Sequence, residues 1–351
     1  MNKPVSLPLS TPPLAFRPRL AQRAANLAVS LAPWAIIAGL LWAGLFIKPQ
    51  PAGASVAPPL LERRDHLYGL ARLQDGAVLA CGSDGKILAI AADGSLQRQA
   101  TPARDTLQDI AMLDERHAVA VGNDNLILFS DDAGGHWQKA AQVPRSDVAN
   151  KLTRVRAGRG GLAIATGEMG ALLASHDYGR TWQRLRGEED VAWNDVAILD
   201  DGALLVVGEF GRILRSADAG ATWEELPAPV ASSLMAVSFR DASHGVAVGL
   251  DGVLLTSRDG GRQWQQVDLG MHDHLLDVLW NPQRQQWFAV GTLGRWASGG
   301  AMAGAGDWHS GVLGERAMAW HTRALADGGD YWLAGADIGR WDGQRWSPLN
   351  P

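Results

Sequence analysis

The sequence predicts an all-β fold, a seven-bladed β-propeller built of four-stranded antiparallel blades and preceded by one N-terminal transmembrane helix. Three observations support this prediction. A short turn motif, S-x-D-x-G-x-x-W, occurs four times, and a paired-glycine element recurs seven times along the chain. An uncharged run of 21 residues, 27–47, precedes both repeats and is long enough to cross a bilayer. Repeats of four short strands every 40–45 residues are typical of propeller blades.

The turn motif occupies residues 130–137, 175–182, 216–223 and 257–264, and its tryptophans are separated by 45, 41 and 41 residues. Asp side chains bond nearby backbone amides and Gly tolerates positive φ, so the two residue types favour a tight turn. Ser adds a local hydrogen bond, and the Trp is expected to fold back over the turn as an apolar plug. We therefore assign a structural role to Ser130, Asp132, Gly134, Trp137, Ser175, Asp177, Gly179, Trp182, Ser216, Asp218, Gly220, Trp223, Ser257, Asp259, Gly261 and Trp264.

The paired-glycine element ends one apolar strand and begins the next. Its second member, where positive φ is expected, is usually Gly and once Asn. The first members are Gly82, Gly122, Gly167, Gly208, Gly249, Gly291 and Gly335. The second members are Gly85, Asn125, Gly170, Gly211, Gly252, Gly294 and, one residue late, Gly339. Seven elements predict seven blades over residues 65–351, and the sequence leaves open whether residues 54–64 add a strand that closes the ring.

The N-terminal segments predict a membrane anchor. Residues 1–26 form a Pro-containing tail with Arg17, Arg19 and Arg23, residues 27–47 form the span, and residues 48–64 form a Pro-rich linker. Basic residues before the span place the N-terminus in the cytoplasm and the propeller in the periplasm of an inner-membrane, single-pass protein. A cleaved signal peptide is the alternative, since residues 52–54 (AGA) offer a small-residue site. The apolar run exceeds the usual length of about 7–15 residues, which favours the uncleaved anchor.

Composition narrows the function classes. A formal net charge of −5 argues against a nucleic-acid binder, which would show a basic excess. The single cysteine, Cys81, excludes an internal disulfide, and its apolar neighbours indicate a buried, inert thiol.

The two kinds of repeat resemble those of known protein families. The turn motif resembles the Asp-box, or bacterial neuraminidase repeat, of sialidases and sortilin-type receptors. Residues 208–216 (GEFGRILRS) followed by an Asp-box, and the related residues 167–170 (GEMG), resemble the photosystem II stability/assembly factor family over about residues 65–350. This resemblance implies a non-enzymatic scaffold for membrane-protein complexes that uses no cofactor. Relatives in non-photosynthetic bacteria occur beside RND-type (MMPL-like) exporters, so the implied partner is an integral membrane protein or transporter complex.

The alternative function is a carbohydrate-active propeller, either a lectin-like binder or a sialidase-like glycosidase. Such a glycosidase needs a Tyr nucleophile helped by Glu, an acid/base Asp and three arginines. The chain has only Tyr68, Tyr178 and Tyr331, and Tyr178 lies inside a turn motif. The early Phe/Tyr-Arg-Ile-Pro motif of such enzymes is absent, so we predict no catalytic residues. Clustered carboxylates, a Tyr and an Arg triad at the channel mouth would instead favour the glycosidase.

Two motifs contain residues that can ligate metals. Asp131-Asp132 does not supply the several spaced oxygen ligands that calcium needs, and residues 272–274 (HDH) have no third ligand of clear spacing. We therefore predict no metal site.

Equivalent positions in a propeller lie on a ring, which groups residues that are distant in sequence. The residue after the second glycine is basic in four blades. These basic residues either keep the strand edges soluble or form a docking surface for an acidic segment or lipid headgroups. The four basic residues are Lys86, Arg212, Arg295 and Arg340.

A second series lies 13 or 14 residues before the first glycine, on the innermost strands, where side chains are expected to line the central channel. It comprises Gly69, Asp109, Arg154, Asp195, Ala236, Asp277 and approximately His321, and we predict Asp109, Arg154, Asp195 and Asp277 as channel-lining residues.

Overall fold

The computed structural model describes residues 19–46, 60–315 and 317–349, in two compact units that comprise Met1–Pro58 and Pro59–Pro351. The first unit contributes one helix, α1 (Arg19–Phe46), with Pro33 inside it. Its apolar part, Gln22–Phe46, contains an 18-residue window with a mean hydropathy of 1.9, and no residue of that window is buried. α1 is therefore long and apolar enough to cross a membrane, a property that signal sequences share. Residues 47–59, which hold most of the predicted linker, lie outside the described residues.

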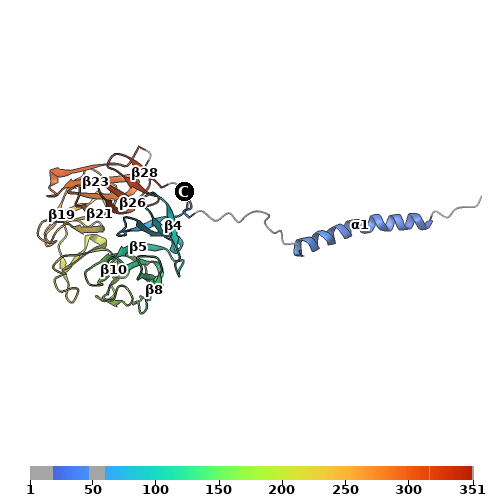
Figure 1. Cartoon of the computed structure of the whole chain (residues 1–351), viewed down its shortest axis with the longest axis horizontal. Coiled ribbons are helices and arrows are strands. Elements are labelled where there is room, and N and C mark those ends of the chain that lie inside the picture. Colours follow the sequence, from blue (N-terminus) through green and yellow to red (C-terminus); the bar gives the residue numbers. More distant parts are fainter. Residues whose placement is uncertain (1–18, 47–59, 316, 350–351) are drawn as a thin grey trace, which may run out of the picture. The chain divides into compact units, whose positions relative to one another are not determined.

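The second unit is a ring of seven sheets, each with four antiparallel strands in sequence order (Figure 1). Blades one to three comprise β1 (Leu67–Arg72), β2 (Val78–Gly82), β3 (Ile87–Ile90) and β4 (Leu96–Gln99); β5 (Leu107–Met112), β6 (Ala118–Gly122), β7 (Ile127–Ser130) and β8 (Gln138–Lys139); and β9 (Leu152–Ala157), β10 (Ala163–Gly167), β11 (Leu172–Ser175) and β12 (Gln183–Arg184). Blades four and five comprise β13 (Trp193–Ile198), β14 (Leu204–Gly208), β15 (Ile213–Ser216) and β16 (Glu224–Leu226); and β17 (Leu234–Phe239), β18 (Gly245–Gly249), β19 (Leu254–Ser257) and β20 (Gln265–Gln266). Blades six and seven comprise β21 (Leu275–Asn281), β22 (Gln286–Gly291), β23 (Arg295–Gly300) and β24 (Trp308–Val312); and β25 (His321–Asp327), β26 (Asp330–Gly335), β27 (Ile338–Trp341) and β28 (Trp346–Pro348). The predicted fold class is confirmed.

The apolar core consists of seven clusters, and each cluster joins two adjacent blades. Second strands such as β2 and β14 are buried along their whole length, because they are covered by a blade on each side. In the cluster between blades one and two, for example, Leu79 and Leu128 are both fully buried. Packing between neighbouring sheets, which removes apolar surface from water, is what holds the ring together.

The ring closes without a shared strand, since β1–β4 and β25–β28 are each continuous in sequence. Hydrogen bonds join the first strands of these two blades: Arg72 donates to the carbonyl oxygen of Ala326 at 2.8 Å, and Thr322 donates to that of Tyr68 at 3.3 Å. Leu61 is buried in the cluster between the two blades. Residues 60–64 thus pack against the closure without forming a strand, and residues 54–59 lie outside the described part of the chain.

The turns divide the ring into two faces. In every blade, the turn from the second to the third strand and the loop to the next blade lie at one end, which we call the paired-glycine face. The turns between first and second and between third and fourth strands lie at the other end, the Asp-box face. In blades one, two and four to six, the paired-glycine turn is a short 3-10 segment: η1 (Ser83–Gly85), η2 (Asn123–Asn125), η3 (Glu209–Gly211), η4 (Leu250–Gly252) and η5 (Thr292–Gly294). A sixth 3-10 segment, η6 (Ala305–Asp307), belongs to the β23–β24 connection.

The prediction that Gly339 is the second member of the paired-glycine element in blade seven was wrong. The second member of the paired-glycine element has positive φ in the first six blades, for example 62° at Gly85 and 60° at Asn125. Gly339 instead lies within β27 and pairs with Leu333. Only Ala336 and Asp337 separate β26 from β27, so the blade-seven turn is shorter than the others and needs no left-handed residue.

Candidate functional site: the central channel and the faces of the ring

The four S-x-D-x-G-x-x-W turns, hereafter Asp-boxes, share one hydrogen-bond pattern. In blade four, Ser216 donates to the carboxylate of Asp218 at 2.8 Å, and the Gly220 amide donates to Ser216 Oγ at 2.8 Å. The Thr222 amide donates to the same carboxylate at 2.8 Å, and Trp223 Nε1 donates to the Gly220 carbonyl at 3.1 Å. The other three copies repeat these Ser, Gly and Trp bonds.

These bonds hold the charged form of the Asp. Side-chain and backbone bonds from Thr222, with the Ser216 bond, lower the pKa of Asp218 to about 2. The glycine of each turn also packs closely on the preceding blade, since a Cβ at Gly134 would lie 2.7 Å from Leu79. The Asp-boxes therefore close the turns through local hydrogen bonds, and their glycines also contact the preceding blade.

Three aspartates from alternate blades meet in the central channel. Asp109, Asp195 and Asp277 lie on the first strands of blades two, four and six and are buried. One oxygen of each accepts a backbone amide of the following blade, at 3.0 Å from Val155, 3.1 Å from Val237 and 2.8 Å from Ala324. Each carboxylate thus ties its own blade to the next one.

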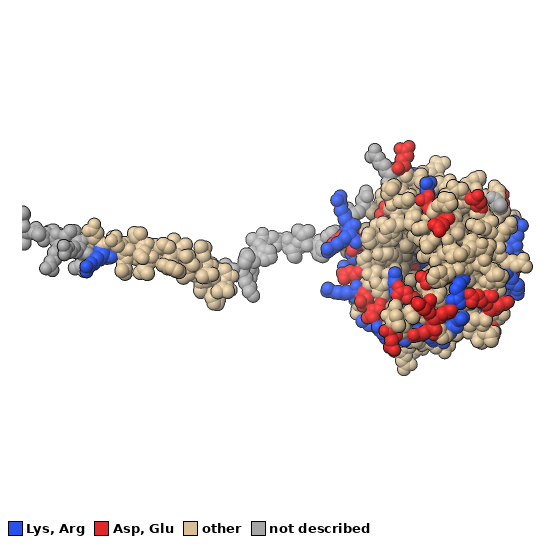
Figure 2. Space-filling model, turned by 180° about the vertical axis from the view of Figure 1, so that it is seen from behind, with Lys and Arg blue, Asp and Glu red and all other residues tan. Residues whose placement is uncertain are grey.

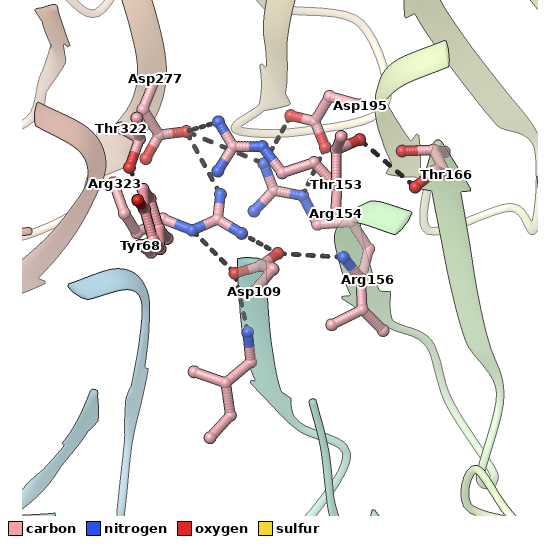
Figure 3. Close-up of polar contacts among 12 residues, drawn as sticks. Tyr68, Asp109, Thr153, Arg154, Arg156, Thr166, Asp195, Asp277, Thr322 and Arg323 are labelled. Atoms are coloured by element: carbon pink, nitrogen blue, oxygen red, sulfur yellow. Dashed lines mark hydrogen bonds and ion pairs between the residues drawn. The ribbon is translucent and has the colours of Figure 1, made fainter. Parts of the chain in front are cut away.

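Three arginines complete the cluster (Figure 3). Arg156 binds Asp195 through two hydrogen bonds of 2.9 and 2.6 Å, and Arg154 lies 3.4 Å from Asp277. Arg323 lies between Asp109 and Asp277, with contacts of 3.1 and 3.3 Å. We call these three aspartates and three arginines the channel plug. Its formal charge sums to zero, which suits a buried position where an unpaired ion would be costly.

The electrostatics of the plug favour its ionised form. Burial alone would raise the pKa of Asp195, but the charges of Arg156 and Arg154 outweigh it and lower the pKa below its usual value. Burial likewise opposes the charge of Arg323, yet the neighbouring Asp109 raises its pKa. Opposite charges thus stabilise the ionised forms of Asp195 and Arg323, whereas burial and the charge of Arg323 lower the pKa of Arg154.

The structure brings Asp109, Arg154, Asp195 and Asp277 together in the channel plug. In blade seven the expected residue was wrong: Arg323, not His321, occupies the equivalent position. Arg323 pairs with Ala334, the residue before Gly335, whereas His321 pairs with Gly335 itself. The hairpin formed by β25 and β26 is one residue shorter than the first hairpin of most other blades. Counting 13 or 14 residues back from Gly335 therefore missed Arg323.

Sequence reasoning also missed Arg156. It follows Arg154 by two residues on β9, so both side chains point to the same side of the strand. Because side chains alternate along a strand, Arg156 could have been predicted to face the channel once Arg154 was assigned to it.

The plug lies between two cavities. One, of about 390 Å³, opens toward the Asp-box face and is lined by Arg72, Met112, Arg156, Trp280 and Arg323, among others. The other, of about 170 Å³, lies toward the paired-glycine face and is lined by side chains that include Tyr68, Gln108, Lys151, Arg154 and Met235.

The channel contains carboxylates, an Arg triad and the nearby Tyr68, the residue types that would favour a glycosidase. Their arrangement does not provide a free cationic site, because each arginine contacts an aspartate. The Tyr68 ring is stacked on Trp320 at 5.7 Å between centroids. A substrate carboxylate would have to compete with resident aspartates for every guanidinium.

The four basic residues predicted to dock a partner each have an acidic neighbour. Lys86 is only 4% exposed and pairs with Asp65, and Arg212 pairs with Glu225 at 2.7 Å. Arg295 pairs with Asp273 at 2.8 Å, and Arg340 lies 3.0 Å from Asp327 and 3.2 Å from Asp330. Figure 2 shows basic and acidic side chains intermixed on the face drawn there.

Arg340 does not occupy the same position in its blade as Lys86, Arg212 and Arg295. It lies inside β27 opposite Trp332, whereas Lys86 precedes β3. Because Ile338 and Ile87 occupy equivalent positions, Arg340 is displaced along the strand toward the Asp-box face.

The remaining candidates also have local roles. His274 Nδ1 accepts the Asp251 amide at 3.0 Å, and its neighbour Asp273 is engaged with Arg295. Within the described residues, no group of three or more His, Cys, Asp or Glu side chains is placed to hold a metal ion. Cys81 is fully buried, and burial raises its pKa well above the ordinary value, so the thiol stays protonated.

The comparisons with known proteins agree with this architecture. The family described as "Photosynthesis system II assembly factor YCF48" matches residues 88–226 and 216–281, which together make up more than half of the chain. No curated protein matches the sequence.

Two solved structures have the same fold. One, described as "YCF48 bound to D1 peptide", is 13% identical, with a TM-score of 0.63, over 81% of this chain and 94% of that one. The other, "YCF48 from Cyanidioschyzon merolae", is 15% identical, with a TM-score of 0.63, over 79% of this chain and 95% of that one. The sequence match over residues 88–281 shows that this chain belongs to the photosynthesis system II assembly factor YCF48 family.

Proposed function

We propose that this chain is a membrane-anchored, non-catalytic scaffold that assists the assembly or action of an inner-membrane protein complex. The observation that carries the proposal is an assembly-factor propeller preceded in the same chain by an apolar helix of 25 residues. A ring on a membrane anchor is suited to holding a segment of a membrane protein, because the anchor confines both to the same surface.

Two further observations support a role in binding. A structure of the same fold is described as bound to a peptide of another protein, D1. In this chain the ionisable groups of the channel are engaged with one another, as expected of a structural core rather than of groups that transfer protons.

The finer part of the proposal concerns the partner and the location. The family resemblance suggests an RND-type (MMPL-like) transporter as the partner complex. Arg17, Arg19 and Arg23 precede the apolar helix and only Lys48 follows it closely, which supports a cytoplasmic N-terminus and a periplasmic propeller.

Purification through a C-terminal tag after mild detergent extraction tests the partner. We expect an integral membrane protein to be recovered with the full chain in stoichiometric amount. The matched control replaces Gln22–Phe46 by a cleavable signal peptide, so that the same propeller is exported without its anchor. Recovery of no membrane protein with the full chain would refute the scaffold proposal.

Protease access to the C-terminal tag tests the topology. We expect the tag to resist protease in intact cells and to be digested once the outer membrane is permeabilised. A tag that is digested only after the inner membrane is lysed would place the propeller in the cytoplasm.

A further inference from the structure

The exposed large apolar side chains of the propeller are distributed unequally between its two faces. Within residues 60–315 and 317–349, six of the seven belong to the paired-glycine face or to the segment that enters the ring there. Met302, in the β23–β24 turn of the Asp-box face, is the exception. The six are Leu60, Val148, Phe210, Leu293, Val312 and Met318.

Phe210 is the aromatic residue among them. It lies at the tip of η3, is 70% exposed and has a φ of 58°. The equivalent residues of blades one, two and five are Asp84, Asp124 and Asp251, with φ of 56°, 53° and 57°. Those of blades three and six are Met169 and Leu293, with φ of 54° and 55°. Asp tolerates this left-handed conformation better than an aromatic residue does. Phe210 therefore has a strained backbone conformation, and its ring is mostly exposed. The stability of the fold does not explain why an aromatic residue occupies this position.

The surroundings of Phe210 combine apolar and acidic groups. On one side, the carbonyl of Val230 lies against Gly211, which brings the loop with exposed Pro227 and Pro229 beside the turn. On the other side, the Ala192 amide donates to Glu209 at 2.8 Å, which brings the loop with exposed Glu188 and Asp190 beside it. We call Phe210, Pro227, Pro229, Glu188 and Asp190 the Phe210 patch.

The basic side chains nearest this patch are already neutralised. Arg212 pairs with Glu189 and Glu225, and Arg186 pairs with Glu189. Arg184 pairs with Glu188 of the patch at 3.4 Å, which leaves Asp190, among the described residues, as the unpaired carboxylate of the patch. The patch thus presents an apolar tip within a locally negative field, which attracts cationic groups and repels anionic lipid headgroups.

The same face receives the chain from the membrane anchor. Asp65 pairs with Lys86 beside the paired-glycine turn of blade one, and Leu61 is buried between blades seven and one. Thirteen residues, 47–59, separate α1 from this segment in the sequence.

From these observations, and resting on the proposed function, we propose that the paired-glycine face is the docking face of the scaffold, with Phe210 as its anchor. The occupant is a segment of a partner membrane protein that carries an aliphatic side chain next to Lys or Arg. The aliphatic group covers the Phe210 ring and the prolines, and the cation lies against Glu188 and Asp190. Central aromatic anchors with charged rims are typical of protein interfaces.

Substitution of Phe210 by the residue used in three other blades provides the test. Phe210→Asp suits the left-handed backbone, so the ring should fold normally while the apolar anchor is lost. Met302→Asp makes the same change on the Asp-box face and is the matched control. The probes are two dye-labelled peptides, one alternating Leu and Lys and the other alternating Leu and Glu, added to the full chain in neutral-lipid nanodiscs.

We expect the Leu/Lys peptide to bind the wild-type chain and Met302→Asp with equal affinity, and Phe210→Asp at least tenfold more weakly. The Leu/Glu peptide should bind all three at least tenfold more weakly than the Leu/Lys peptide binds wild type. Equal binding of the two peptides by wild type, or equal loss in both variants, would overturn the proposal.

A second measurement separates a protein occupant from a lipid one. An environment-sensitive dye is attached to a cysteine that replaces Met318, and the full chain is placed in nanodiscs with and without anionic lipid. We expect the same emission from both. A blue shift that requires anionic lipid would show that the bilayer covers this face and would overturn the assignment of a protein segment.

Tagged purification distinguishes failure of this inference from failure of the proposed function. If wild type and Phe210→Asp recover the membrane partner equally, the docking face is wrong and the scaffold function stands. If wild type recovers no membrane protein, the scaffold function itself fails.

Discussion

Arg323, on the first strand of blade seven, contacts Asp109, on the first strand of blade two, and so reaches past blade one. Its Nε lies 3.1 Å from Asp109 Oδ1, and a second nitrogen contacts Oδ2. Blade one permits this contact because Gly69 stands at the equivalent position. A Cβ on Gly69 would lie 2.7 Å from the Asp109 Cα and 2.8 Å from the Cys81 sulfur. The ring has no strand shared between its first and last blades. The Arg323–Asp109 ion pair connects blade seven to blade two, and the absence of a side chain at Gly69 leaves room for it.

Arg323→Met should destabilise the propeller strongly. Among the described residues, Asp109 would lose its only arginine partner and Asp277 one of three, while both carboxylates stay buried. Leaving a buried charge uncompensated costs about 3–5 kcal/mol in the free energy of unfolding. Urea unfolding of the variant measures the loss, and the double variant with Asp109→Asn should recover part of it. A loss below about 1 kcal/mol would mean that the plug is not coupled in this way.

Gly69→Ala should destabilise the ring because the added methyl meets backbone of blade two rather than a flexible side chain. Overpacking of this kind costs about 1–3 kcal/mol. Gly187→Ala is the control, since nothing lies within 4 Å of its added Cβ. Thermal unfolding that is the same for the two variants would contradict the close approach at Gly69.

Asp218→Asn should lower the melting temperature at neutral pH, and the difference from wild type should shrink as the solution is acidified. Hydrogen bonds lower the pKa of Asp218 from 3.8 to about 2 in the folded state. A lowered folded-state pKa means that the stabilisation is complete above pH 3.8 and is lost as the pH falls through about 2. Melting curves at several pH values check this, with the exposed Asp147→Asn as control. A difference that stays constant down to pH 2 would show that the charge of Asp218 contributes nothing.

Phe210→Asp should stabilise the isolated protein while it weakens docking. Relief of a bulky residue in the left-handed region contributes about 1–2 kcal/mol. The reciprocal change, Asp251→Phe in the equivalent turn of blade five, should destabilise by a similar amount. Chemical unfolding of both variants measures the two effects. Destabilisation by both would mean that the Phe210 ring contributes to the fold.

The parts of the fold that could be predicted are those held by interactions between residues close together in the sequence. An Asp-box completes its hydrogen bonds within eight residues, so Ser216, Asp218, Gly220 and Trp223 reveal the turn in any context. Six of the seven paired-glycine elements were aligned correctly for the same reason. The seventh failed because its turn and the preceding hairpin are both shorter, which no local motif marks.

The channel site was predicted in part. Asp109, Arg154, Asp195 and Asp277 followed from ring positions, but Arg156 and Arg323 required the strand register. The basic residues expected to dock a partner could not be assessed from the sequence, because their acidic neighbours, such as Glu225 for Arg212, lie on other strands.

The sequence by itself determined the number of blades, the turn chemistry and the apolar helix, since each depends on side chains close together in the chain. Only the tertiary structure decided that the channel is a charge-balanced plug, that the ring closes without a shared strand, and which face exposes its apolar residues. Those features depend on contacts such as that between Asp109 and Arg323, 214 residues apart. Burial and pairing over that separation arise only when all seven blades are packed in one ring.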